Sequence, residues 1–549
     1  MHPTGTDIRE PAASPAANQP AIVRDLLRPE SLRPSGRGRV ELRTTHASWV
    51  FLCGADVFKL KRPVDLGFLD FRTIEARRRD CEDEVRLNQR LAPEIYLGVL
   101  PVRRDAAGRH RVEEEGRGEI VDWVVHMRRL PDDASAASLL AAGRLDRDRL
   151  AALARTVARS LDEAPTAAGF GAAVALRHNV EENLAQSRAF AAPDGMVEPE
   201  ALEAIWRYHD RALRLGAERF AARARAGRIR EGHGDLRLEH VYFVPSATGD
   251  ERPVVIDCLE FSERLRAGDV AAEIAFLAME LEGAGEPALA AGFVARSAEA
   301  LDDFDLYGVL DFYLAYRAWV RAKVAGLVAR DPQAGHSVRL RKLEEARRCF
   351  SLARALGAKP ITAPALVAVG GVIGSGKSTL ATALGAELAA PVVGSDRTRK
   401  ALAGLAPTQR GSDDLYTPAR IEATYAELLR RAEVVLRSGR TVIVDATFGS
   451  SLWRRRAANV AGACGARFAF IEALCPDWNV LRQRVRQRAS RPAISDAAEP
   501  LVDRRIAEGH PPRLPPGDDH LLVDTSRSAP QALADALAVL RALDITAPR

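Results

Sequence analysis

The sequence predicts two domains of different class: an α+β domain with a small β lobe and a helical lobe, then an α/β domain with a parallel sheet. Three short apolar runs follow one another between residues 40 and 60, separated by turn residues such as Gly54, which is typical of an antiparallel sheet. From residue 365 onward, strand-like and helix-like segments alternate, which is typical of parallel strands joined by crossover helices. Prolines 360 and 364 separate the two patterns.

The length and composition indicate several domains and a cytoplasmic location. A chain of 549 residues is too long for one hydrophobic core. The formal net charge is +5, from 79 basic and 74 acidic residues, so charge gives no case for a nucleic-acid or membrane-surface protein. Six scattered cysteines without C-x-x-C spacing, and no signal-like start, indicate reduced thiols. We expect a disordered start, a first domain, a linker and a second domain at residues 1–38, 39–356, 357–364 and 365–549.

The elements of the first domain can be assigned from their patterns in chain order. A helix is expected after Arg72, and further strands follow it. Beyond Pro131 the sequence is Ala-rich and helical, and two short strands that each present a carboxylate interrupt it before a second helical stretch. The expected ranges are a helix at 73–91, strands at 96–103 and 120–127, helices within 131–226, strands within 232–243 and 253–261, and helices within 269–356.

The second domain shows the regular alternation of an open parallel sheet. Its apolar runs are short and rich in Val and Ala, and the segments between them have helical patterns. The expected strands are 365–369, 391–394, 441–445 and 468–474, and the expected helices are 379–388, 418–438 and 452–461.

The first strand of the second domain leads into the motif Gly371-x-x-x-x-Gly376-Lys377-Ser378, which is a P-loop. Glycines let backbone N–H groups turn toward a phosphate, the lysine reaches the β- and γ-phosphates, and the serine hydroxyl is placed to bind Mg²⁺. The motif therefore predicts ATP and Mg²⁺ as cofactors; the alternative is a Gly-rich turn without nucleotide. The residues expected to hold the phosphates are Gly371, Gly374, Ser375, Gly376, Lys377, Ser378 and Thr379.

Two carboxylates of the second domain follow strands at the edge where the P-loop lies. Asp396 is placed to accept a proton from an acceptor hydroxyl, and Arg399, one helical turn later, could hold an anionic group of that acceptor. Asp445 ends an apolar strand, as a Walker B aspartate does, and would position Mg²⁺. The alternative for Asp445 is a turn residue at a strand end.

A basic run follows the last predicted strand. At helical spacing, most of its arginines would lie on a solvated face. In small-molecule kinases, however, a mobile lid brings arginines to the transferred phosphoryl group. Arg488 and Arg491 are the candidates for that role.

The first domain carries an ordered set of polar residues: Lys59 at the end of a strand, Glu84 on the next helix, His233-Gly-Asp235 in a loop, and Asp257 after an apolar strand. In this order the set resembles the aminoglycoside phosphotransferases and, more distantly, the protein kinases, over residues 40–350. The resemblance implies that Lys59 pairs with Glu84 and holds ATP phosphates, that Asp235 is the catalytic base, and that Asp257 binds Mg²⁺.

Two departures separate the first domain from the pattern it resembles, and the choice of the pairing lysine is a further question. His240 stands where the family has an asparagine for the second metal, and imidazole is a weak ligand for Mg²⁺. The turn 44–48 lacks the expected glycines. Lys61 competes with Lys59 as the pairing lysine, and Lys59 is preferred because Val57, two residues earlier, would cover the adenine. The alternative for the whole domain is a degenerate, non-catalytic regulator.

The order P-loop, Ser-Asp-x-x-Arg, Val-Asp-Ala-Thr and Arg-rich segment resembles the gluconate-kinase and polynucleotide 5′-kinase branch of P-loop kinases, and also the zeta-toxin type. The whole chain resembles bacterial fusions of an aminoglycoside phosphotransferase-like domain with an AAA-type ATP-binding kinase domain. These resemblances imply a bifunctional kinase that phosphorylates hydroxyl groups of small molecules. A nucleic-acid acceptor is not expected but stays open for the second domain, as does the oligomeric state.

Overall fold

The computed structural model describes residues 19–32, 38–45, 47–65, 70–171, 173–192, 195–246, 249–332, 334–357, 364–489, 502–503, 506–507, 514 and 520–548. The chain forms two compact units, each made from two stretches of sequence. The first unit comprises residues 1–171 and 227–273, and the second comprises 172–226 and 274–549. Most of the predicted linker, residues 358–363, lies outside the described residues.

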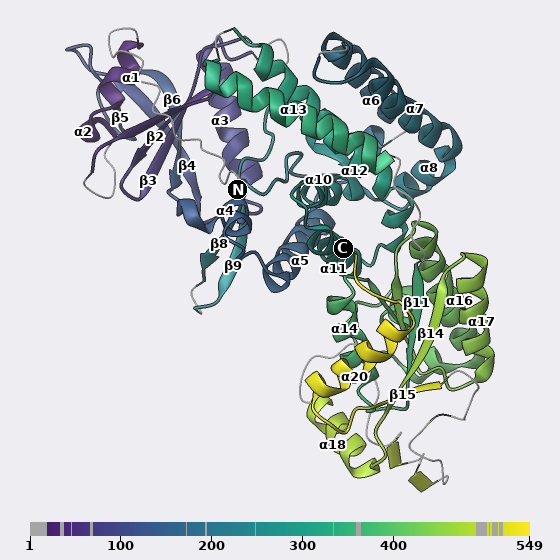
Figure 1. The fold of residues 1–549 in the computed structure, drawn as a ribbon. Helices are drawn as coiled ribbons and strands as arrows, with labels where there is room; N and C mark the ends of the chain where they lie inside the picture. The colour runs from purple at the N-terminus through teal and green to yellow at the C-terminus, as the bar shows by residue number, and fades with distance from the viewer. Residues whose placement is uncertain are drawn as a thin grey trace. The chain divides into compact units, whose positions relative to one another are not determined.

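The first unit contains a six-stranded sheet in the order β1-β2-β3-β6-β4-β5 (Figure 1). All neighbouring strands are antiparallel, which confirms the sheet class predicted from the three short apolar runs. The strands are β1 (Glu41–Thr44), β2 (Ser48–Cys53), β3 (Asp56–Lys61), β4 (Tyr96–Arg104), β5 (His110–Val112) and β6 (Glu119–Arg128).

Each face of this sheet has its own hydrophobic core. Phe58 and Leu60 of β3 lie in one core together with Val23, Leu26 and Leu32 of the short helices α1 (Ala21–Leu26) and α2 (Pro29–Leu32). The prediction of a disordered start is therefore wrong for residues 21–32, whose apolar side chains, spaced three and six residues apart, find a sheet to cover. Residues 1–18 and 33–37 lie outside the described residues.

The opposite face is covered by α3 (Ile74–Asn88), which packs against β4 and β6. The helix starts at the N-cap Thr73, whose side chain accepts a hydrogen bond from the amide of Ala76. The other elements in this part of the sequence are short, apart from α5 and α10. They are α4 (Ala136–Ala141), α5 (Arg147–Glu163), β7 (Ile229–Glu231), β8 (Val241–Pro245), β9 (Glu251–Val255), α9 (Glu263–Arg266), β10 (Ala267–Asp269) and the start of α10 (Val270–Gly283).

Helices build one part of the second unit. The segment 313–323, which carries aromatic and basic side chains, belongs to α12, and its Tyr313 and Trp319 are fully buried. α12 packs along α13. The helices are α6 (Ala173–Ser187), α7 (Pro199–Leu215), α8 (Ala217–Arg225), α11 (Pro287–Leu301), α12 (Leu310–Arg330) and α13 (His336–Gly357).

A buried ion pair joins α8 to the turn after α11. The guanidinium of Arg223 donates to both carboxylate oxygens of Asp303 at 3.0 and 2.9 Å, and both side chains are 3% exposed. Replacing Arg223 with leucine leaves a buried carboxylate without its cation, so we expect the free energy of unfolding to fall by about 3–5 kcal/mol. The check is the urea midpoint followed by circular dichroism. Leucine at both positions is expected to restore most of the loss; no recovery in the double variant would contradict this account.

The other part of the second unit is a five-stranded parallel sheet in the order β12-β13-β11-β14-β15. Its core joins the strands to α14 and α20 on one face, and α16 and α17 cover the other (Figure 1). The strands are β11 (Ala365–Gly370), β12 (Val392–Gly394), β13 (Val442–Asp445), β14 (Arg467–Leu474) and β15 (His520–Asp524). The helices are α14 (Lys377–Glu387), α15 (Ser395–Leu402), α16 (Pro418–Arg437), α17 (Ser451–Ala463), α18 (Trp478–Ala489) and α20 (Ala529–Ala542).

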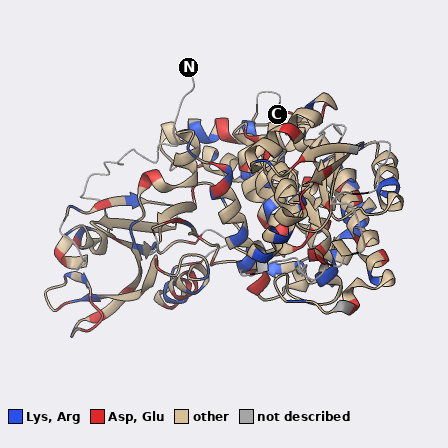
Figure 2. Ribbon diagram, turned by 90° about the horizontal axis from the view of Figure 1, so that it is seen from below, with Lys and Arg blue, Asp and Glu red and all other residues tan. Residues whose placement is uncertain are grey.

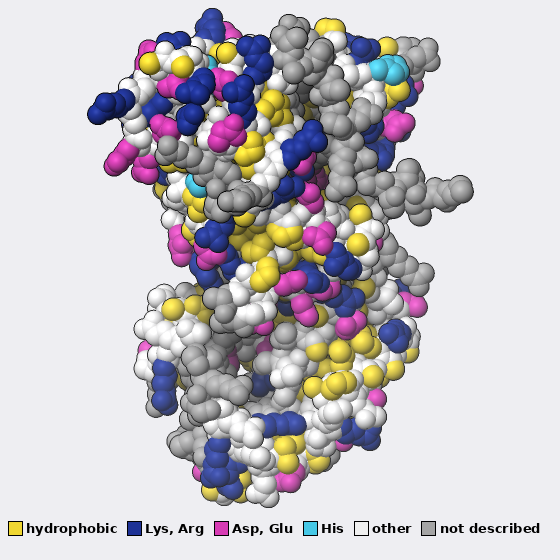
Figure 3. All heavy atoms as spheres, turned by 90° about the vertical axis from the view of Figure 1, so that its left-hand side faces the viewer, with side chains coloured by type: hydrophobic (Ala, Val, Ile, Leu, Met, Phe, Trp, Pro, Cys, Tyr) yellow, Lys and Arg dark blue, Asp and Glu magenta, His cyan; other side chains and the backbone are white. Residues whose placement is uncertain are grey.

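Charged residues of both signs are interspersed along the ribbon in Figure 2, and basic and acidic side chains lie side by side on the face in Figure 3. This mixing agrees with the formal net charge of +5. Among the described residues, no helix combines the length and the hydropathy needed to cross a membrane. All six cysteines are free, in agreement with the expectation of thiols.

Candidate active sites

The first candidate site lies in the first unit, where β3 meets α3. Because side chains alternate along a strand, Lys59 and Lys61 point to the same face of the sheet. The ammonium of Lys59 is 2.9 Å from Oε1 of Glu84 and 3.1 Å from Oδ1 of Asp257. Burial alone would lower the pKa of Lys59, but Asp257 and Glu84 raise it well above its usual value. Lys59 is therefore a fixed cation between two carboxylates that the sequence analysis grouped with it.

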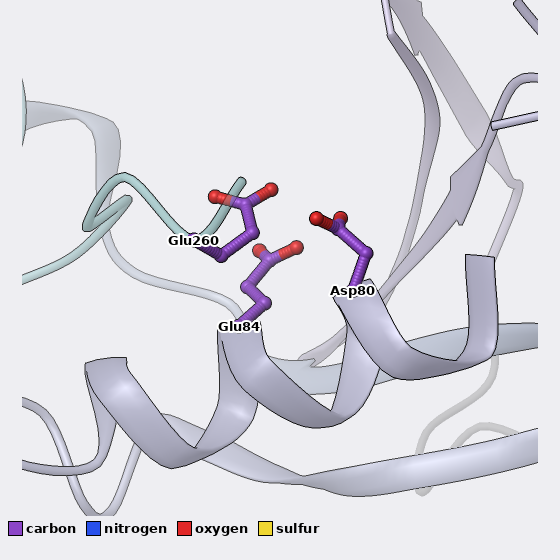
Figure 4. Close-up of side chains that lie close together, drawn as sticks. All are labelled: Asp80, Glu84 and Glu260. Atoms are coloured by element: carbon purple, nitrogen blue, oxygen red, sulfur yellow. The ribbon is translucent and has the colours of Figure 1, made fainter. Parts of the chain in front are cut away.

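Lys61 occupies a separate and more deeply buried cluster. Its ammonium lies 2.6 Å from Asp80, 2.7 Å from Oε2 of Glu84 and 2.6 Å from Glu260, and it is 1% exposed. Figure 4 shows the three carboxylates turned toward one another, Asp80 and Glu84 from α3 and Glu260 from the loop after β9. Their oxygens lie within 4.8 Å of one another, close enough to share a metal ion. Here the ammonium of Lys61 is the shared cation.

Each lysine thus contacts a different carboxylate oxygen of Glu84: Lys59 contacts Oε1 and Lys61 contacts Oε2. Burial raises the pKa of Glu84, but Lys59 and Lys61 outweigh it and bring the pKa below its usual value. Burial also raises the pKa of Asp80, to about 7, and Lys61 offsets only part of that rise. From the sequence, Lys59 and Lys61 are alternatives for pairing with Glu84. In the structure both contact Glu84, and Lys59 is the one that contacts Asp257 as well.

The turn with His233 and Asp235 is held by the backbone. Gly234 has φ +83°, and a Cβ there would come within 2.9 Å of the Cα of Arg266, so only glycine fits. Nε2 of His233 is 2.9 Å from the carbonyl of Ile256, so it carries the proton and donates. Burial lowers the pKa of His233 to about 4, so this imidazole is neutral and ties the turn to the neighbouring strand end. Asp235 is left with its carboxylate partly exposed.

Asp257 follows β9 in a left-handed conformation, with φ 65°. This conformation is uncommon for a side chain other than glycine, and its cost is met by hydrogen bonds of the surrounding backbone. The amide of Asp257 donates to the hydroxyl of Tyr96 at 3.1 Å, and the amide of Cys258 donates to Asn88 at 2.9 Å. The ammonium of Lys59 holds the pKa of Asp257 well below its usual range. The turn therefore fixes an ionised carboxylate beside Lys59.

His240 lies beside both predicted functional aspartates. Its Nδ1 is 3.5 Å from Oδ2 of Asp235, and its Nε2 is 3.6 Å from Oδ2 of Asp257. One imidazole nitrogen and carboxylate oxygens form a donor set that fits a divalent cation. The structure thus brings Lys59, Glu84, Asp235, His240 and Asp257 into one neighbourhood. His46, in the turn that replaces a glycine-rich loop, lies outside the described residues.

The second candidate site is the P-loop between β11 and α14. Gly371, Gly374 and Gly376 have φ of +148°, +78° and +89°, so all three adopt conformations that favour glycine. A Cβ at Gly371 would stand 2.4 Å from Oγ of Ser375 and 2.8 Å from the carbonyl of Ala473, and a Cβ at Gly374 would stand 2.8 Å from a backbone carbonyl. The turn is therefore too tight for side chains at these glycine positions. Lys377 and Ser378 begin α14 directly after the turn. This geometry fits a bound phosphate at the helix N-terminus.

Asp445 lies at the end of β13, next to this helix. Burial raises its pKa, while Lys377 and a hydrogen bond from Ser378 act in the opposite direction. Its Oδ1 is buried and has no hydrogen-bond partner in the described part of the chain. A buried carboxylate oxygen without a donor is a costly arrangement that a cation would relieve. Ser378 and Asp445 therefore fit a Mg²⁺ ion at the phosphates.

Asp396 and Arg399 begin α15, directly after β12. Nη1 of Arg399 donates to Asp396 at 2.6 Å, and its guanidinium lies 4.6 Å from the centre of the Tyr416 ring. Because β12 pairs with β13 in parallel, with Gly394 opposite Asp445, Asp396 lies at the same edge of the sheet as the metal-binding candidate. The predicted base and metal ligand therefore face one crevice.

A cavity of about 350 Å³ opens beside the P-loop. Its walls include residues that the sequence analysis did not assign: Arg484 of α18, and Thr525, Arg527 and Ala529 after β15. Arg484 donates to the carbonyl of Thr525 at 2.6 Å, which joins α18 to the end of the sheet. β15 was not among the predicted strands. The sequence pattern that could have indicated it is the apolar run 520–524, which ends in an aspartate as β13 does. The cavity is large enough for a nucleoside.

The two arginines proposed for the lid cannot be placed at this site. Arg488 belongs to α18, but its side chain is not described, and Arg491 lies outside the described residues. Arg482, earlier in the same run, pairs with Asp503 at 2.5 Å and is partly exposed. The proposed lid roles of Arg488 and Arg491 stay predictions.

Comparisons with known proteins agree with this organisation. Residues 366–510 match a family model described as an AAA domain. "Uncharacterized protein Rv2004c" of Mycobacterium tuberculosis is 34% identical over 481 residues, which cover 85% of this chain and 90% of that protein. The chain belongs to the family of this mycobacterial protein. At 85% of this chain, the match includes sequence from both units.

Solved structures are similar to the two parts separately. A choline/ethanolamine kinase family protein from Mesorhizobium loti is 15% identical and covers 59% of this chain and 93% of its own, with a TM-score of 0.32. The Mycobacterium tuberculosis APS kinase in complex with AMPPNP and APS is 20% identical and covers 33% of this chain and 99% of its own, with a TM-score of 0.24. The predicted fusion of an α+β part with an AAA-type α/β P-loop part is confirmed.

Proposed function

We propose that the P-loop part of the second unit transfers the γ-phosphoryl group of Mg-ATP to a hydroxyl of a small molecule. The observation that carries this proposal is the shared edge of the parallel sheet. It holds a glycine turn beside Lys377 and Ser378, a buried and unpartnered oxygen of Asp445, and the carboxylate of Asp396. A P-loop that only binds nucleotide needs the first two features but has no use for a carboxylate base.

Each residue has a separate task in this scheme. Mg-ATP supplies the transferable phosphoryl group. The P-loop amides and Lys377 hold the negative phosphate oxygens, and Ser378 and Asp445 provide oxygen ligands for the metal. Asp396 accepts the proton of the acceptor hydroxyl as the oxygen attacks. The hydrogen bond from Arg399 fixes the orientation of the Asp396 carboxylate.

The site of the first unit supports a second kinase activity of the same type. Lys59 would hold the α- and β-phosphates, Glu84 would orient Lys59, Asp257 would bind the metal, and Asp235 would serve as base. The competing proposal is a first unit without catalysis that regulates the P-loop part, and the observation that favours it is an imidazole at position 240. A polynucleotide 5′-kinase or zeta-toxin-like activity of the P-loop part is a further alternative, and a short oligonucleotide acceptor tests it.

Replacing Asp396 with asparagine tests the proposed base. Nucleotide affinity is expected to stay within about twofold, because Asp396 touches the acceptor side. In an Asp257→Ala background, which disables the candidate site of the first unit, phosphoryl transfer from γ-labelled ATP to a pool of small hydroxyl compounds is expected to fall by about 100- to 10,000-fold, the usual contribution of a general base. The matched control is Asp414→Asn, which changes an exposed aspartate in the same part of the chain. Equal transfer by Asp396→Asn and the control would rule out this role for Asp396.

A further inference from the structure

The orientation of the His240 ring is set by the main chain. Nδ1 lies 2.9 Å from the carbonyl oxygen of Asp235, and a carbonyl can only accept, so Nδ1 carries a proton. Nε2 is therefore the ring nitrogen that can offer a lone pair to a metal ion. A histidine that ligates a metal usually donates its other ring N–H to a carbonyl or carboxylate in this way, which fixes both tautomer and direction. The side chain is 12% exposed, so the ring is held within the site rather than in solvent.

The free nitrogen of this ring points at acceptors. Nε2 is 3.6 Å from Oδ2 of Asp257 and 3.6 Å from Oε1 of Glu239. Both distances exceed a normal hydrogen bond, and a ring nitrogen facing two carboxylates is favourable only with a proton on it or a metal ion between them. Glu239 is already engaged by the guanidinium of Arg237 through the same oxygen. The ammonium of Lys59 donates to Oδ1 of Asp257. Oδ2 of Asp257 and Nε2 of His240 are therefore the two atoms that a single cation could bind.

The spacing of this pair suits a shared metal ion. Two donors that each lie about 2.1 Å from one cation are about 3.0–3.5 Å apart for bond angles between about 90° and 110°. The observed 3.6 Å is slightly longer than that range, so the two donors need to move only a little toward each other to share one ion. A second histidine of the same unit shows the contrast: Nε2 of His126 is 2.8 Å from Oδ1 of Asp56, a direct contact with no room for an ion.

We propose that His240 and Asp257 bind a divalent cation that accepts imidazole, Mn²⁺ in preference to Mg²⁺, and that this ion accompanies the nucleotide of the first unit. The proposal rests on the nucleotide site proposed above. Mg²⁺ favours oxygen ligands and loses water reluctantly, whereas Mn²⁺ accepts both carboxylate and imidazole. The two candidate sites of the chain would then differ in metal, with oxygen ligands at Ser378 and Asp445 and a mixed pair at His240 and Asp257.

The test measures nucleotide affinity with each metal in the full chain. A Lys377→Ala/Asp445→Asn background removes the P-loop site, and AMPPNP binding is followed by calorimetry in excess Mn²⁺ or Mg²⁺. We expect AMPPNP to bind at least about tenfold more tightly in Mn²⁺ than in Mg²⁺. In His240→Asn this ratio of affinities should fall to about threefold or less. His126→Asn, the matched histidine control, should keep the ratio of the background.

The outcomes separate the metal preference from the nucleotide site itself. Nucleotide binding with equal affinity in both metals, or an unchanged ratio in His240→Asn, overturns the metal proposal and leaves the nucleotide site standing. No nucleotide binding with either metal overturns the nucleotide site as well. A second measurement needs no substitution at residue 240: with ¹⁵N-labelled histidine, pulsed EPR of bound Mn²⁺ should show ¹⁵N coupling, and its absence in the nucleotide complex also overturns the proposal.

Discussion

Replacing Lys377 with alanine is expected to lower the nucleotide affinity of the P-loop site by about 10- to 100-fold, since a hydrogen bond from a charged group contributes about 1.5–3 kcal/mol. Phosphoryl transfer at that site should fall further, by about 100- to 1000-fold, because the charge that develops in the transition state loses its nearest cation. Calorimetry and transfer of labelled phosphate measure the two effects. Lys342→Ala, which removes a partly exposed lysine paired with Glu345, is the control and should change neither quantity.

The same variant tests whether the chain holds one nucleotide site or two. Each unit has a lysine beside a carboxylate: Lys377 with Asp445 in one, Lys59 with Asp257 in the other, and we propose that both pairs hold a nucleotide and its metal. Wild type is therefore expected to bind two nucleotides and Lys377→Ala to keep one, which Asp257→Ala then removes. If Lys377→Ala alone abolished all binding, the first unit would not be a nucleotide site, and the regulatory proposal would replace the second kinase.

The sequence predicted most of what depends on local pattern. The strand pattern up to residue 60 and the helical pattern after Arg72 predicted the elements that carry Lys59 and Glu84, and the family resemblance implied that these two residues pair. The glycines of the P-loop are recognisable because their positive φ values admit few other residues. For these features, neighbouring residues in the sequence determine the geometry.

Features that depend on distant contacts were not predicted. Glu260 meets Lys61 across 199 residues of sequence, because a left-handed turn at Asp257 directs the following loop toward α3. Nothing in the local pattern of residues 257–261 specifies that direction. The wall formed by Arg484 and Thr525 likewise arises where α18 and the end of β15 converge. The short helices within residues 21–32 were not predicted because they contain few apolar residues. Those residues are buried only because they pack against one face of the sheet, which the local sequence does not show.

Replacing Lys61 with methionine is expected to destabilise α3 by about 3–5 kcal/mol, because three buried carboxylates would lose their shared cation. Lys61 is 1% exposed, and Asp80, Glu84 and Glu260 are each less than 10% exposed, so water cannot take its place without rearrangement. Hydrogen exchange of α3 peptides, detected by mass spectrometry, measures this local opening free energy. Arg86→Met on the same helix removes an exposed pair with Asp83 and should cost less than about 1 kcal/mol.

The stability loss caused by Lys61→Met is expected to depend on pH, because Asp80 changes its charge near neutral pH. In the folded chain the pKa of Asp80 is raised from 3.8 to about 7, so the folded state binds a proton that the unfolded state has lost. The contribution of Asp80 to the free energy of unfolding therefore falls as the pH rises from about 4 to 7, and it does not change further above about pH 7. Lys61 limits that fall by lowering the pKa of Asp80, so the deficit of Lys61→Met should be larger at pH 8 than at pH 6, and Glu260→Gln in the same chain should recover part of it. A deficit equal at both pH values would show that Lys61 acts by packing rather than by charge.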